Sequence, residues 1–199
     1  MRQLLLEKIK KDHKKIIDRI DNEDIAVYEF LRKKFRNVDV AKDSVFPFVF
    51  RSFYRMDNAG LTPEFKTEFF RIMQEYREKS FNMEGVLRRL GKFKTLRGLK
   101  AVQLSFVSKM YNMINQDKPI YDSHIARFLG LGHPAGRFDQ RIDGALRIYT
   151  EMEQVYAEIS NRGNCSPIIK MFDARFKGNT LRQIKKLDFI FWSAGKLNI

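Results

Sequence analysis

Apolar residues recur every three or four positions along most of the chain, the spacing of one buried face of an α-helix. No segment shows the strict alternation of a half-buried strand, and no internal repeat is visible. The pattern therefore predicts an all-α fold. Helices are expected over residues 2–20, 23–36, 46–54, from 63 onward, 82–93, 123–129, 136–160 and 179–195. Within residues 101–116, a turn is expected to lead into a further helix that begins at Ser108-Lys109.

Size and composition predict a compact protein. The chain has 199 residues, of which 44% are hydrophobic, including 18 Phe. That is enough for one domain over residues 1–199, in which two small helical lobes share a core. No run of about 20 apolar residues is present, and the apolar run at the N-terminus is short for a signal peptide. A cytoplasmic protein that does not span a membrane is therefore expected.

Charge indicates the class of partner. The chain carries 38 Lys and Arg against 24 Asp and Glu, a formal net charge of +14. Such an excess favours an acidic partner, with nucleic acid first, an anionic membrane second and the ribosome third. A single cysteine, Cys165, excludes an internal disulfide, a four-cysteine zinc site and an iron–sulfur cluster. No metal and no cofactor is expected.

The positive charge is concentrated in one segment. Residues 85–116 contain no Asp or Glu, and a carboxylate there would repel a phosphate backbone. The segment therefore predicts contact with nucleic acid through its cations, which are Arg88, Arg89, Lys92, Lys94, Arg97, Lys100 and Lys109.

Two residues next to this segment can carry chemistry. A lysine in the first turn of a helix has its pKa lowered by the helix dipole, so we expect Lys109 to supply a nucleophilic amine. Asp122, in "PIYDSHIARFL", is placed to cap the helix that follows and also to stabilise positive charge and move a proton. The pair suits cleavage of an N-glycosidic bond.

The same stretch resembles the helix-hairpin-helix DNA glycosylases, in particular the branch that includes 8-oxoguanine DNA glycosylase. The family has a hairpin, then Lys in a "(T/S)K" pair, then a "VDxHxxR" element. Ser108-Lys109 matches the pair, and "IYDSHIAR" matches the element at Asp122, His124 and Arg127. Ser108 and Arg127 are therefore also expected to contact DNA. The resemblance implies that Lys109 is the Schiff-base nucleophile, with Lys100 as the fallback, and that Asp122 is the catalytic carboxylate.

Looser matches extend the resemblance from about Phe46 onward. It implies that Asn58, with Asp57 beside it, fills the gap left by a flipped base, and that the hairpin and catalytic region covers about 85–132. It also implies that the last helix closes the base pocket with an aromatic ring, for which the candidates are Phe189, Phe191 and Trp192. The family hairpin is Gly-x-Gly, whereas the corresponding residues 104–107 contain no glycine.

The sequence therefore predicts a two-lobe helix-hairpin-helix glycosylase that binds double-stranded DNA as a monomer in the nucleoid. It would flip out and excise a modified base, by resemblance an oxidised guanine, with possible cleavage of the abasic strand. A hypermodified base of phage DNA, excised in antiviral defence, is the second candidate substrate. Two other classes stay open: a DNA-binding protein without catalysis, and a basic protein that binds RNA or the ribosome.

Overall fold

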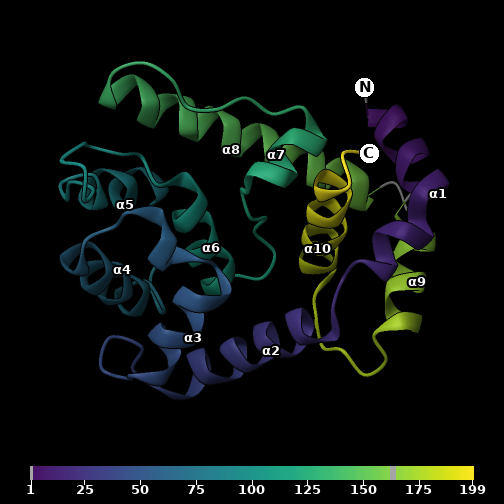
Figure 1. Ribbon diagram of the computed structural model, residues 1–199, viewed down its shortest axis with the longest axis horizontal. Helices are drawn as coiled ribbons and strands as arrows, with labels where there is room; N and C mark the ends of the chain where they lie inside the picture. Colours follow the sequence, from purple (N-terminus) through teal and green to yellow (C-terminus); the bar gives the residue numbers. More distant parts are fainter. Residues whose placement is uncertain (1, 162–164) are drawn as a thin grey trace.

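The structure, a computed structural model, describes residues 2–161 and 165–199 (Figure 1). Its elements confirm the predicted all-α class: the described residues form no named strand. They comprise α1 (Arg2–Asp18), α2 (Asn22–Asn37), α3 (Val45–Phe53), the 3-10 helix η1 (Met56–Ala59), α4 (Pro63–Glu75), α5 (Met83–Leu90), α6 (Leu104–Ile114), α7 (Ser123–Leu129), α8 (Phe138–Asn161), α9 (Ser166–Arg175) and α10 (Gln183–Lys196).

The chain crosses the molecule and returns. Figure 1 shows α2 running from the side that holds α1 and α9 to the opposite side, where α3 to α6 gather. The segment after α6 leads back to α7, and α10 lies in the middle. Among the described residues, no helix combines the length and the apolar character that crossing a membrane requires.

Helix ends follow signals that are legible in the sequence. Thr62 caps α4 because its hydroxyl oxygen accepts the Phe65 N–H at 3.3 Å, and Pro63 opens the helix. Asp122 caps α7, and Gly130 ends it in the left-handed conformation at φ 67°. Local sequence signals therefore set the start of α4 and both ends of α7.

The helix α6 begins earlier than predicted. The residues matched to the family hairpin, 104–107, form its first turn, so the hairpin placement at these residues is wrong. The reason is burial, because Leu104, Phe106 and Val107 all lie in the core. The connection from α5 to α6 is instead the loop 91–103, which turns at Gly98 with φ 76°.

Helix α9 is absent from the prediction. Residues around Cys165 read as a loop in sequence, yet Ser166 to Arg175 are helical and bury Ile168 and Phe172. Cys165 is buried just before this helix, and its sulfur accepts a hydrogen bond from the Gln183 side chain at 3.1 Å. The cysteine is therefore part of the packing between α9 and α10.

Candidate active site

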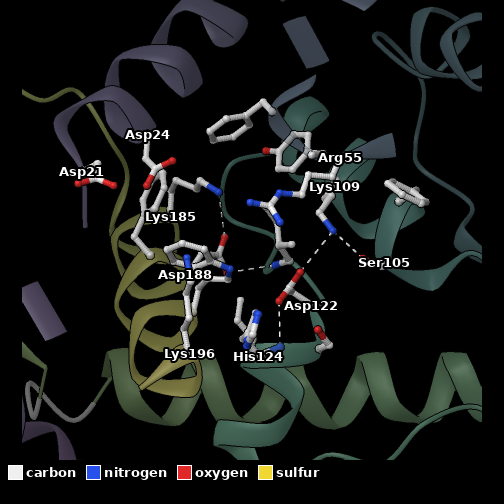
Figure 2. Close-up of a pocket in the computed structure, with 18 residues that line it drawn as sticks. Asp21, Asp24, Arg55, Ser105, Lys109, Asp122, His124, Lys185, Asp188 and Lys196 are labelled. Carbon is white, nitrogen blue, oxygen red and sulfur yellow. Dashed lines mark hydrogen bonds and ion pairs between the residues drawn. The ribbon is translucent and has the colours of Figure 1, made fainter. Parts of the chain in front are cut away.

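A cavity of about 520 Å³ lies where five parts of the chain meet (Figure 2). The contributors are the beginning of α2, the residues that end α3, the first two turns of α6 and the start of α7, closed by one face of α10. Both residues singled out for chemistry, Lys109 and Asp122, line this cavity. Its volume falls within the range of about 300–1,000 Å³ that is usual for small-molecule sites.

Lys109 is buried on the cavity wall, with 6% of the residue exposed. Its ammonium donates a hydrogen bond to Ser105 Oγ at 2.5 Å and lies 5.3 Å from the centre of the Phe106 ring. Burial lowers the pKa of Lys109, and the Asp122 carboxylate partly offsets this effect. The predicted direction of this pKa shift is confirmed, but the predicted cause is wrong. Lys109 lies in the second turn of α6, beyond the reach of the helix dipole.

The two carboxylate oxygens of Asp122 make different contacts. Oδ1 accepts the His124 backbone N–H at 2.9 Å, which is the cap of α7. Oδ2 lies 3.8 Å from Lys109 Nζ, and Figure 2 shows the two side chains pointing toward each other across the edge of the cavity. The cap holds one oxygen and thereby aims the other at the lysine.

Two buried hydrogen bonds fix the backbone that carries Asp122. The Ser108 hydroxyl oxygen accepts the Tyr121 N–H at 2.9 Å, and Asp188 Oδ1 accepts the Ile120 N–H at 3.1 Å. Ser108 was predicted to contact DNA, but its side chain is fully buried and bonded within the protein. That prediction is wrong, and the residue instead holds the segment before α7.

The cavity wall on the far side comes from α10. Phe189 and Trp192, predicted to form the base pocket, both line the cavity. Trp192 is partly buried and meets the His124 ring edge to face, with ring centres 6.3 Å apart. Phe191, the third aromatic candidate, is fully buried and packs on Phe128 at 5.5 Å between ring centres. Its role as a base-contacting ring is therefore excluded.

Sequence reasoning missed a second lysine–aspartate pair on α10. Lys185 Nζ lies 3.8 Å from Asp188 Oδ2, and both side chains are almost completely buried beside the cavity. Burial lowers the pKa of Lys185 and raises that of Asp188. The cavity-lining residues Lys185, Asp188, Phe189, Trp192 and Lys196 recur at helical spacing, and this was the signal in the sequence.

Arg55 was also missed. Its backbone is left-handed at φ 52°, an uncommon conformation for a residue with a side chain. Figure 2 shows its side chain reaching into the cavity between Lys109 and Lys185. Asn58 follows in η1 and is exposed, so it lies on the turn that Arg55 begins. The role of Asn58 in filling a gap in the duplex stays a prediction.

The basic segment divides into paired and unpaired cations. Arg88 pairs with Glu84 and Asp139 at 2.8 and 2.6 Å, and Arg89 with Glu68 and Glu75 at 2.6 and 2.8 Å. Carboxylates from outside the segment therefore neutralise these two arginines. Four exposed cations form no ion pair with any described carboxylate: Lys92, Lys94, Arg97 and Lys100.

Those four cations all lie on the loop 91–103. The loop is tied to the turn after η1, because the Leu96 N–H donates to the Gly60 carbonyl at 2.8 Å. Lys100, the fallback nucleophile, is exposed on this loop and does not line the cavity. Arg127 is exposed on α7, where its guanidinium donates to Asn198 Oδ1 at 2.8 Å.

No group of three or more His, Cys, Asp and Glu side chains within residues 2–161 and 165–199 is arranged to hold a metal ion. No family model, no curated protein and no solved structure matches this chain. The lining of the cavity therefore carries the functional conclusion.

Proposed function

We propose that this protein is a DNA glycosylase with a two-lobe helix-hairpin-helix architecture, which excises a modified base from duplex DNA. The observation that carries the proposal is the Lys109–Asp122 pair, with 3.8 Å between ammonium and carboxylate at the wall of a cavity of about 520 Å³. Binding alone requires neither a buried lysine nor a carboxylate aimed at it.

The chemistry follows from the two side chains. Burial favours the neutral amine of Lys109, which attacks C1′ of the flipped nucleotide. The glycosidic bond breaks with its electron pair going to the base nitrogen, which takes up a proton. Asp122 stabilises the positive charge that develops on the sugar and relays protons. Ring opening then gives an imine on Lys109, from which the strand can be cleaved by β-elimination.

Base flipping is a necessary part of the proposal, because C1′ of a stacked nucleotide cannot be reached from a cavity wall. The partly buried Trp192 and the Phe106 ring supply apolar surface to an extruded base, and polar side chains supply hydrogen bonds. An oxidised guanine is the default substrate by resemblance, and a hypermodified phage base is the second.

The unpaired cations of loop 91–103 are proposed to contact phosphates. Replacing Lys94 and Arg97 together with alanine is expected to weaken duplex binding. Each lost phosphate contact also reduces the slope of log K against log salt concentration by about 0.9. Fluorescence anisotropy at several salt concentrations measures this slope. Arg88→Ala is the control, because its charge is already paired; an equal loss in the control contradicts the assignment to the loop.

The test of the proposal is release of a free base. Purified protein is incubated with duplexes that each carry one altered base, namely 8-oxoguanine, uracil, hypoxanthine or a modified cytosine, and released bases are identified by mass spectrometry. We expect release from at least one duplex, and a loss of about 10²-fold or more in Lys109→Gln. Binding to every duplex with no release would leave the DNA-binding protein without catalysis as the function.

A further inference from the structure

Lys185 is the most deeply buried of the cations that line the cavity. Only 3% of the residue is exposed, and it donates no hydrogen bond to any described residue. Its nearest carboxylate oxygen, Asp188 Oδ2, lies 3.8 Å away, beyond hydrogen-bond distance. The ammonium instead lies 4.4 and 4.6 Å from the centres of the Tyr28 and Phe189 rings. The ammonium therefore has no hydrogen-bond acceptor within the described residues, and an acceptor on a ligand in the cavity could supply one.

Asp188 holds Lys185 in place but leaves its donors free. Oδ1 of Asp188 accepts from the Tyr156 hydroxyl at 2.8 Å and from the Ile120 N–H at 3.1 Å. Oδ2 is buried and makes no hydrogen bond within the described residues. The carboxylate is thus fixed by its neighbours and favours the charged form of the lysine, against the burial that lowers the pKa of Lys185 to about 8.

The two buried lysines of the cavity therefore have different surroundings. Lys109 already donates to Ser105 and faces Asp122, the residue assigned to chemistry. Lys185 has its donors free, and Figure 2 shows it on the opposite side of the cavity, beside Asp188. Two more polar atoms from lining residues are buried without a partner, the Tyr54 hydroxyl and His124 Nδ1. Together with Asp188 Oδ2, three buried side-chain atoms without a partner thus belong to residues that line the cavity.

We propose that Lys185 selects the base, by donating a hydrogen bond to a ring carbonyl oxygen of the flipped nucleotide. This inference rests on the proposed glycosylase function and names its substrate class: bases that present C=O at the edge facing α10, in preference to bases that present C–NH₂ there. An amino group in that position places donor against donor and leaves Lys185 without an acceptor. A site built for a hydrogen bond discriminates strongly against a base that cannot make it.

The test compares bases that differ in that one group. Duplex affinities are measured for two pairs, uracil against cytosine and hypoxanthine against adenine, each opposite an abasic position so that flipping costs little. The measurement uses the Asp122→Asn protein, so that no base is lost during binding. We expect the carbonyl member of at least one pair to bind about tenfold tighter or more. We also expect Lys185→Met to reduce that ratio to near one.

Lys186→Met is the matched control. Lys186 is the next residue on α10, but its ammonium pairs with Asp173 at 2.6 Å and does not line the cavity. The control should keep the full preference. A change of fold would alter affinity for all four duplexes, whereas loss of the donor alters the ratio. Equal affinities within both pairs, or a preference that survives in Lys185→Met, would overturn the inference while leaving base release intact. Absence of base release from every altered duplex would instead overturn the proposed function.

Discussion

Asp122→Asn is expected to lower the rate of base release by about 10²–10⁴-fold, the usual contribution of a positioned acid–base group. Asparagine keeps the shape of the side chain and is as good a helix cap as aspartate, so the cap of α7 is retained. What the substitution removes is the negative charge 3.8 Å from Lys109. Single-turnover kinetics on the duplex that releases its base measure the effect, and thermal unfolding checks that stability is unchanged.

The pH dependence of this variant separates its cause from a simple loss of fold. Asp122 raises the pKa of Lys109 against the effect of burial. Without the carboxylate that pKa falls further, so the pH at which the neutral amine forms should move downward in Asp122→Asn. The variant would then have more free amine at neutral pH and still be slower. That combination assigns the lost rate to the carboxylate.

The control for charge is Asp143→Asn. Asp143 is exposed on α8 and forms no ion pair with any described residue, so this variant has the same net charge as Asp122→Asn. Both should bind DNA slightly more tightly than the parent protein, and only Asp122→Asn should lose activity. Equal rates for Asp122→Asn and the parent would remove Asp122 from the mechanism and leave it as a cap.

Gly195→Ala is expected to destabilise the fold more than any other single methyl group added at a described glycine. A Cβ at this position would lie 2.0 Å from the backbone oxygen of His124 and 2.5 Å from its carbonyl carbon. Helix α10 packs directly on α7 at this position, and the backbone of neither helix can move aside cheaply. Overpacking of this kind typically costs about 1–3 kcal/mol and can cost more.

The consequence for function follows from geometry. Gly195 lies at the crossing of α10 and α7, the two helices that present Lys185 and Asp122 to the cavity. If Gly195→Ala folds, the helices must separate and base release should fall as well. Urea unfolding measures the stability. Gly132→Ala is the control, because nothing lies within 4 Å of its added Cβ. Equal stability of both variants would contradict the close crossing.

Most of the fold could be predicted because its signals are local. Apolar periodicity, the Thr62-Pro63 start and the glycine after α7 gave helices whose ends lie within a few residues of those observed. The predicted start of α6 is wrong, because the pair Ser108-Lys109 was placed in the first turn. Burial of Leu104 and Phe106 instead extends the helix toward the N-terminus. Helix α9 was not predicted, because only two of its residues are buried and a proline is almost the only sequence signal at its start.

The candidate site was also predicted only in part. Lys109 and Asp122 lie on consecutive helices, so a local pattern was enough to pair them. Lys185 and Asp188 come from the far end of the chain, and only the packing of α10 on α7 brings them to the cavity. Three of the four partners of Arg88 and Arg89 are also distant in sequence, namely Asp139 on α8 and Glu68 and Glu75 on α4, whereas Glu84 lies only one helical turn before Arg88.

The most direct test of the central claim is to find which residue becomes bound to DNA. The protein is incubated with the duplex that releases its base, the imine is reduced with borohydride, and the modified peptide is sequenced by mass spectrometry. We predict one adduct, on Lys109, that is lost in Lys109→Gln and retained in Lys100→Gln. Release of the base without any adduct, or an adduct on a residue outside the cavity, would contradict the assignment of Lys109 as the nucleophile.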